Sequence, residues 1–238
     1  MTEAGSKKFR VKVTKDGPYL ATGGIPLAED MIVLGDDGEP ERWAKGLGHP
    51  QTESCALCRC GASQNKPFCD GTHFPIGFDG TETAARTGTL ERTEKTCGQE
   101  IDLTFSEELC AAARFCHAGE EAWGYAERSS DPEARQRAIE EACACPSGSL
   151  AAWDKKTGRI IEPDLEPSLG LIENPQTETS GPLWVKGGIP IESADGGEYE
   201  VRNRVTLCRC GQSKNKPFCD GTHVATGFRS DRQSRGRD

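Results

Sequence analysis

The stretch that decides the fold reads Cys58-Arg-Cys-Gly-Ala-Ser-Gln-Asn-Lys-Pro-Phe-Cys-Asp-Gly-Thr-His73. It returns 150 residues later as Cys208-Arg-Cys-Gly-Gln-Ser-Lys-Asn-Lys-Pro-Phe-Cys-Asp-Gly-Thr-His223, with 14 of 16 positions identical. Upstream, residues 17–26 and 181–190 share Gly-Gly-Ile-Pro at an offset of 164 rather than 150. The first copy therefore carries 14 extra residues between these blocks, around positions 34–48. The sequence therefore contains an internal duplication, and both copies keep every cysteine and histidine of the string.

The string has the spacing C-x-C-x8-C-x3-H, which supplies three thiolates and one imidazole. The last spacing places Cys69 and His73 on the same face of one turn. Asp70 and Asp220 stand where a side chain can cap that turn. The number and type of these ligands fit two kinds of site equally well: a structural zinc site with three cysteines and one histidine, and an iron–sulfur site.

The string resembles the CDGSH iron–sulfur domain, the family of mitoNEET-type proteins, whose pattern is C-x-C-x2-[ST]-x3-P-x-C-D-G-[ST]-H. Both copies fit every element of it, and the resemblance covers roughly half of the chain. It implies two [2Fe–2S] clusters, held by Cys58, Cys60, Cys69 and His73 and by Cys208, Cys210, Cys219 and His223. Single-motif members form homodimers with a strand-swapped β cap. Two motifs in one chain therefore imply that this chain contains both halves of such a dimer, and that it is a monomer.

We expect an α+β protein with three parts. Residues 1–82 and 169–238 are expected to form small β-rich cluster domains that pack as a pseudo-two-fold β cap with the clusters at one end. Residues 83–168 are expected to form a helical middle segment, with one helix starting at Ser106 and a second at Asp131-Pro132. The sequence also predicts short strands, at residues 9–13, 19–21, 31–34, 183–185 and 199–205.

The middle segment holds four further cysteines, Cys110, Cys116, Cys143 and Cys145. Its Cys-Pro-Ser-Gly ending resembles the close of a divergent single-cluster ferredoxin segment, although the compact C-x2-C-x2-C run of ferredoxins is absent. On one continuous helix Cys110 and Cys116 would point about 120° apart, which argues against a shared cluster. A third cluster, thiols that pack between helices and a redox-active pair stay open as alternatives, and packing thiols are the preferred interpretation.

Composition restricts the classes of partner. The net charge is −9, and residues 98–180 carry seven Lys/Arg against 17 Asp/Glu, which argues against binding to nucleic acid. No apolar run approaches the length of a membrane span, and Met1–Gly5 begins no apolar signal segment, so we expect a cytoplasmic protein without a membrane partner. Twelve cysteines in a reducing compartment favour metal binding over disulfides.

The expected function is one-electron transfer or redox sensing, with redox proteins as partners. The alternatives are a carrier that donates [2Fe–2S] clusters to acceptor proteins, and a zinc-stabilised interaction module. We expect no enzyme, because the sequence has no nucleotide-binding glycine fingerprint, paired acid–base constellation or nucleophile elbow. Each histidine is expected to titrate near neutrality and so to link protons to the cluster. The extra cation Lys214 predicts that the second cluster is slightly easier to reduce.

Overall fold

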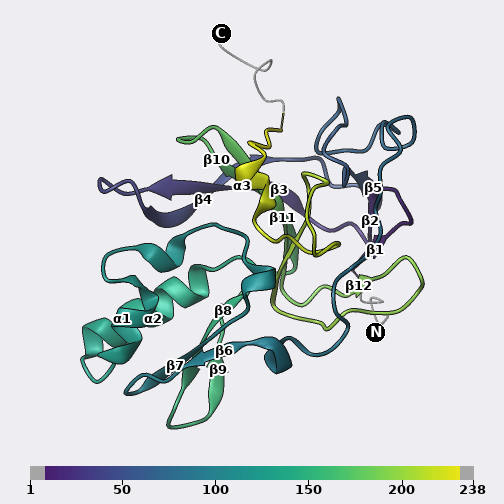
Figure 1. Cartoon of the computed structure of the whole chain (residues 1–238). Coiled ribbons are helices and arrows are strands. Elements are labelled where there is room, and N and C mark those ends of the chain that lie inside the picture. The colour runs from purple at the N-terminus through teal and green to yellow at the C-terminus, as the bar shows by residue number, and fades with distance from the viewer. Residues whose placement is uncertain (1–8, 231–238) are drawn as a thin grey trace, which may run out of the picture.

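The computed structural model describes residues 9–230 and has mixed α+β architecture, as expected (Figure 1). The strands are β1 (Arg10–Val13), β2 (Tyr19–Thr22), β3 (Leu27–Leu34), β4 (Pro40–Gly48), β5 (Ser54–Leu57), β6 (Glu94–Thr96), β7 (Ile101–Phe105), β8 (Leu150–Asp154), β9 (Arg159–Ile161), β10 (Ser168–Asn174), β11 (Thr179–Lys186), β12 (Ile191–Glu192) and β13 (Arg204–Leu207). The helices are α1 (Glu121–Glu127), α2 (Pro132–Ala144) and α3 (Thr222–Ala225), and three 3-10 turns are η1 (Thr89–Arg92), η2 (Glu107–Leu109) and η3 (Phe115–His117).

Each copy of the duplication completes the sheet of the other. One sheet has the order β12-β1-β2-β5 and the other β13-β11-β10-β3-β4, so β12 and β3 are the exchanged strands. Both exchanged strands pair in parallel, with Val11 opposite Ile191 and Leu169 opposite Leu27. Ile191 follows Leu27 by the same 164 residues that separate the two copies upstream. The two registers are therefore equivalent, which confirms the expected pseudo-two-fold β cap.

One apolar core joins the two halves of the cap. Val11 and Val13 of β1 and Leu169 and Leu171 of β10 are buried in this core, and in each pair the two side chains point to the same face of the strand. Buried Tyr19 on β2 donates its hydroxyl to the carbonyl of Cys208 at 2.8 Å. The sheet of the first copy thus also supports the ligand loop of the second.

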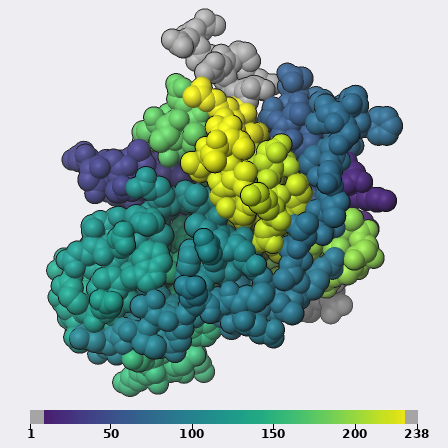
Figure 2. Space-filling view, viewed as in Figure 1, coloured from purple at the N-terminus to yellow at the C-terminus, as the bar shows by residue number. Residues whose placement is uncertain are grey.

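The 14 extra residues of the first copy lengthen the β3–β4 hairpin, which reaches the middle segment. The Trp43 ring lies 4.7 Å from the Phe115 ring and 4.9 Å from the Trp184 ring, centroid to centroid. Trp43 Nε1 also donates to the carbonyl of Ala144 at 3.0 Å. In the space-filling view the purple hairpin lies against the teal middle segment (Figure 2).

The middle segment is only partly helical, since it contains a four-stranded sheet of order β6-β7-β8-β9 as well as α1 and α2. Helix α2 begins as predicted, with Pro132 in its first turn and the Asp131 carboxylate accepting the Glu133 N–H at 2.9 Å. The helix predicted at Ser106 is wrong. The chain makes only η2 and η3 there, separated by left-handed residues Ala112 (φ 51°) and Arg114 (φ 64°) that a right-handed helix cannot contain.

The strand predicted over residues 199–205 is also shorter than expected, because β13 begins only at Arg204. Tyr199 instead packs its ring against Phe218, 4.9 Å away between centroids, and donates its hydroxyl to Glu82. None of the helices within residues 9–230 combines the length and apolar character that crossing a bilayer requires.

Candidate metal centres

Strands β5 and β13 position the two ligand loops. The Cys58 N–H donates to the Pro67 carbonyl at 2.8 Å, and the Cys69 N–H donates to the Ala56 carbonyl at 2.9 Å. The second loop repeats this pattern at the same two distances, with Cys208 bonded to Pro217 and Cys219 to Thr206. Each loop therefore folds back along its strand and returns the third cysteine to the first two.

Side-chain bonds hold the rest of each loop. The Asp70 carboxylate accepts the N–H groups of Gln64 at 2.7 Å and Thr72 at 3.0 Å, and so caps the turn that leads to His73. Asp220 accepts the corresponding N–H groups at 2.8 and 3.0 Å. Both aspartates thus bond to the turn as expected, but the N-cap of α3 is Gly221 and it makes no side-chain cap bond.

The eight predicted ligands come together as four close pairs. The Sγ atoms of Cys58 and Cys60 lie 3.8 Å apart, and those of Cys208 and Cys210 lie 3.7 Å apart. Cys69 Sγ lies 3.3 Å from His73 Nδ1, and Cys219 Sγ lies 3.4 Å from His223 Nδ1. Two sulfurs bound at about 2.3 Å to one tetrahedral metal are about 3.8 Å apart, so each pair has the spacing of two ligands on one metal.

The pairs do not merge into four-ligand sites. Within residues 9–230, no three histidine, cysteine, aspartate or glutamate side chains converge on a point where they could hold one metal ion. A structural zinc ion needs four such ligands around a single centre. Two separate pairs per loop fit a cluster of two metals, each with two protein ligands, better than one zinc ion.

The close cysteine pairs are prepared for metal binding. The hydrogen bond from the Cys60 thiol lowers the pKa of Cys58 to about 6, against the opposing effect of burial. The bond from Cys210 likewise lowers the pKa of Cys208 to about 6. The thiolate is the form that binds metal, and in each cysteine pair the hydrogen bond favours this form on one of the two sulfurs.

The two ligand loops touch each other through glycines. A Cβ atom on Gly61 would lie 2.6 Å from the Cys210 carbonyl oxygen, and one on Gly211 would lie 2.5 Å from that of Cys60. Both glycines have positive φ, at 77° and 78°. Only a residue without a side chain allows this backbone contact, which places the two candidate centres back to back.

The two centres differ in exposure, which sequence reasoning did not reveal. Cys219 and His223 are only 3% and 6% exposed, whereas Cys69 and His73 are half-buried. In the metal-free chain, burial lowers the pKa of His223 to about 4, which differs from the expected titration near neutrality.

The middle segment provides the cover over the second centre. Asn215 Nδ2 donates to the Glu108 carbonyl at 2.8 Å. A Cβ on Gly221 would lie 3.2 Å from the Cys110 carbonyl oxygen and 3.3 Å from the Cβ of Ala112. At the corresponding Gly71, a Cβ would meet nothing within 4 Å.

Buried arginines near the centres also differ in their partners. Arg59 is 1% exposed and donates to the carbonyls of Thr14 at 3.2 Å and Gly80 at 2.6 Å. Arg209, 5% exposed, pairs with the buried Glu173 carboxylate at 2.9 Å. A carboxylate thus neutralises the cation of the second loop, whereas carbonyl dipoles solvate that of the first.

Three of the four middle cysteines gather at the open end of the β7–β8 pair. Phe105 and Leu150 are paired, and the next bond, from the Ser106 N–H to the Ser149 carbonyl, is 2.9 Å long. Cys110 follows this point and Cys145 precedes it, so both sit beside the same strand ends. The break between η2 and η3 removes the helix geometry that argued against Cys110 and Cys116 sharing a site.

Electrostatics agrees with this grouping. Burial raises the pKa of Cys116 to about 12, and the neighbouring charges of Cys145 and Cys110 raise it further. Both Cys116 and Cys145 pack against the apolar core of the middle segment. These three thiols therefore face a common region.

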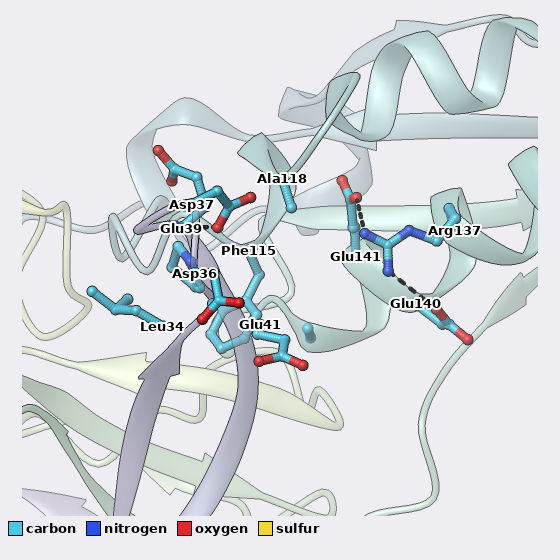
Figure 3. Close-up of a pocket in the computed structure, with 13 residues that line it drawn as sticks. Leu34, Asp36, Asp37, Glu39, Glu41, Phe115, Ala118, Arg137, Glu140 and Glu141 are labelled. Carbon is cyan, nitrogen blue, oxygen red and sulfur yellow. Dashed lines mark hydrogen bonds and ion pairs between the residues drawn. The ribbon is translucent and has the colours of Figure 1, made fainter.

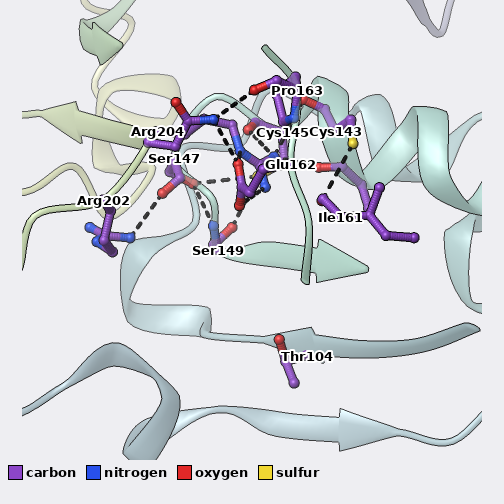
Figure 4. A network of polar contacts seen from close by, with 12 residues as sticks. Thr104, Cys143, Cys145, Ser147, Ser149, Ile161, Glu162, Pro163, Arg202 and Arg204 are labelled. Atoms are coloured by element: carbon purple, nitrogen blue, oxygen red, sulfur yellow. Dashed lines mark hydrogen bonds and ion pairs between the residues drawn. The ribbon is translucent and has the colours of Figure 1, made fainter. Parts of the chain in front are cut away.

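Figure 4 shows the surroundings of Cys145 and the different direction of Cys143. Cys145 Sγ lies 3.5 Å from Ser147 Oγ and 3.4 Å from Ser149 Oγ. Burial raises the pKa of Cys145, but the Arg204 guanidinium and these hydroxyls outweigh it, and the net shift is downward. Cys143 Sγ instead points to the Ile161 carbonyl, 3.7 Å away.

Comparison with known families finds matches in three segments of the chain. Residues 16–74 and 180–224 match the family described as "Iron-binding zinc finger CDGSH type", and residues 96–155 match "Divergent 4Fe-4S mono-cluster". No curated protein and no solved structure matched the chain. The matched segments contain all eight predicted ligands and the four middle cysteines, and both descriptions concern iron. Two segments of the chain therefore match the CDGSH-type iron-binding family, and the segment between them matches a divergent 4Fe-4S mono-cluster family.

Proposed function

We propose that the chain binds two [2Fe–2S] clusters, each through three cysteines and one histidine, and acts as a one-electron carrier. The observation that carries this proposal is the pairing of ligands, two for each metal position, in both copies. When bound, a [2Fe–2S] cluster supplies a site that accepts and releases a single electron. One neutral imidazole in place of a thiolate makes such a site less negative, which favours the reduced state.

The arrangement of the loops supports electron exchange between the centres and with a partner. At Gly61 and Gly211 the backbones of the two ligand loops lie in direct contact, against Cys210 and Cys60 respectively. On the outer side of the first site, Phe74 beside His73 is 86% exposed. We propose that redox proteins approach at this first site, because the middle segment covers the second.

We also propose a third iron–sulfur cluster in the middle segment, held by Cys110, Cys116 and Cys145. The match to a mono-cluster family, together with the mutual electrostatic influence of these three thiols, favours it over packing thiols or a redox pair. The Arg204 guanidinium, which donates to the Cys145 carbonyl at 2.9 Å, would offset the negative charge of such a site. All twelve cysteines are free thiols, which suits a reducing compartment such as the cytoplasm.

Metal analysis of anaerobically purified protein tests both assignments. We expect two irons and two sulfides for each CDGSH-type site, a coloured protein and further iron from the middle segment. Cys145→Ser should remove the middle-segment iron, whereas the matched change Cys143→Ser, at the thiol that points away, should leave it in place. A colourless protein with stoichiometric zinc would contradict the cluster assignment. Equal iron loss in the two variants would contradict the three-cysteine ligand set.

A second experiment separates electron transfer from cluster donation. Oxidised, cluster-loaded protein is mixed with a cluster-free ferredoxin and, separately, with a reduced ferredoxin. We expect the reduced ferredoxin to pass one electron to each cluster without loss of iron from the chain. Transfer of iron and sulfide to the cluster-free ferredoxin would instead favour the donor function. Sedimentation should show a monomer, because the chain supplies both halves of the cap.

A further inference from the structure

A cavity of about 490 Å³ lies between the extended β3–β4 hairpin and the middle segment (Figure 3). Carboxylates dominate its walls: Asp36, Asp37, Glu39, Glu41, Glu140 and Glu141. Arg137 is the single basic side chain among its lining residues. Its hairpin wall, residues 34–41, belongs to the stretch that lengthens the first copy by 14 residues.

Buried carboxylate oxygens without donors stand on both walls. On α2, the Glu141 side chain is 5% exposed and neither of its oxygens has a hydrogen-bond donor. Its nearest cation, Arg137 Nη2, is 3.7 Å away. On the hairpin, Glu39 Oε2 is buried without a donor, while its other oxygen accepts from Arg114 at 2.7 Å. Figure 3 shows Glu39 and Glu141 on two sides of the cavity.

Such oxygens are costly unless a ligand satisfies them. A buried polar group without a partner costs about 1–3 kcal/mol, and a charged one costs more. Burial raises the pKa of Glu141 to about 7, which is the expected response of a carboxylate that lacks a nearby donor. The two walls therefore present acceptors that fit a donor entering the cavity from solvent.

The geometry selects the kind of cation. Within residues 9–230, no three acidic, histidine or cysteine side chains converge closely enough to hold a metal ion, so the carboxylates are spread around the cavity. Between them lie apolar surfaces from Leu34, Pro40, Phe115, Ala118 and Ala144. A ligand that matches both features carries separated ammonium groups on an apolar chain.

We propose that this cavity binds an organic polyamine, with one ammonium group at Glu141, another at Glu39 and the methylene chain along the apolar surface between them. The proposal does not depend on the iron–sulfur clusters, because every side chain in it lies outside the ligand sets. It assigns a role to the 14 extra residues, whose acidic turn forms one wall.

Calorimetric titration of the purified full-length protein with spermidine at low salt tests the proposal. We expect saturable binding at one site. Glu141→Gln should weaken it by at least about tenfold, because a charged hydrogen bond to a buried acceptor is lost. Glu127→Gln, the same change on an exposed position of α1 outside the cavity, should leave the affinity unchanged. Spermidine should also raise the melting temperature of the wild-type protein and of Glu127→Gln, but not that of Glu141→Gln.

Other outcomes would overturn the proposal. Equal affinity of Glu141→Gln and Glu127→Gln would place the bound cation elsewhere. Magnesium binding as tightly as spermidine would indicate general screening of acidic charge. Binding of a lysine-rich peptide where spermidine fails would assign the cavity to a protein partner. If Glu141→Gln fails to fold, Glu41→Gln on the exposed wall provides the same test, with an expected loss of about threefold.

Discussion

The two CDGSH-type sites have the same ligands and nearly the same pairing distances, but they differ in their surroundings. At the first site, Cys69 and His73 are half-buried and Gly71 faces open space. At the second site, His223 is 6% exposed and Gly221 lies against the middle segment. Duplication therefore reproduced the ligand geometry, and the segment between the copies made the two sites unequal. We expect the first site to meet partners and the second to be protected.

The largest expected effect comes from the contact that the two sites share. Gly61→Ala would place a methyl group 2.6 Å from the Cys210 carbonyl oxygen at a φ of 77°. We expect a loss of about 2–4 kcal/mol of unfolding free energy from overpacking and left-handed strain together. Urea denaturation measures the loss, and visible absorbance should show both sites impaired at once.

Gly71→Ala is the control for this change, because it has a φ of 89° but no atom within 4 Å of the added methyl group. It should cost only the backbone strain, about 1–2 kcal/mol. Impairment of the first site alone by Gly61→Ala would show that the two loops are independent.

The next largest effect is expected in acid, where the two sites should lose iron at different pH values. Burial lowers the pKa of His223 to about 4 from 6.5, so the folded metal-free chain binds this proton less readily than the unfolded chain. Stability should therefore fall as the pH drops from about 6.5 toward 4, while His223 itself stays neutral and able to bind metal over that range. In the loaded protein, iron should leave the half-buried first site at a higher pH than the second.

Stepwise acidification with visible absorbance and iron release measures this difference. His73→Cys should abolish the earlier step, because a thiolate ligand replaces the accessible imidazole. Simultaneous loss from both sites would mean that burial of His223 does not protect its cluster.

The reduction potentials of the two sites should differ, but in the direction opposite to the one expected from Lys214, which predicted that the second cluster is easier to reduce. Lys214 is exposed, and water screens its charge, whereas Glu173 neutralises buried Arg209 beside the second site. We expect the second site to have the lower potential. Glu173→Gln should raise it by tens of millivolts, because a negative charge is removed near the reduced cluster.

Glu178→Gln is the matched control, since the Glu178 side chain is 65% exposed and pairs with Arg229 at the surface. Redox titrations followed by EPR measure both variants. A second-site potential equal to that of the first, or unmoved by Glu173→Gln, would contradict this account of the asymmetry.

The smallest effect concerns the cover itself. Gly221→Ala and Gly71→Ala occupy equivalent positions, with φ values of 82° and 89°. Only the alanine at 221 would press on Cys110 and Ala112, at 3.2–3.3 Å. We expect it to cost about 1 kcal/mol more, and to shift acid loss at the second site toward that of the first. Equal unfolding free energies for Gly221→Ala and Gly71→Ala would mean that the middle segment can move away from the second site without cost.

The sequence predicted the close pairing of the candidate ligands, the aspartate side-chain bonds and the start of α2, because each depends on neighbours within a few positions. The helix at Ser106 failed for a tertiary reason. Leu109 packs in the core of the β cap, whereas Phe115 packs with Trp43 and Trp184 in a separate cluster. A single helix could not deliver both side chains, so the chain breaks between them.

The surroundings of the two sites could not be predicted, because they depend on residues far apart in the sequence. The pairing of Arg209 with Glu173 joins residues 36 positions apart, and the cover over His223 comes from residues about a hundred positions earlier. Neither partner leaves a local pattern in the sequence. Residues 1–8 and 231–238 of the predicted first and last domains lie outside the described residues.

The exchange of β3 and β12 also sets an order of events during synthesis. The four ligands of the first site leave the ribosome long before Ile191, whose strand completes the sheet beside Val11. At typical elongation rates the gap, on the order of a hundred residues, takes roughly 10 s. Through that interval the nascent chain carries reactive thiols on an unfinished sheet. We therefore expect stable metal loading of the first site only after nearly the whole polypeptide has been made.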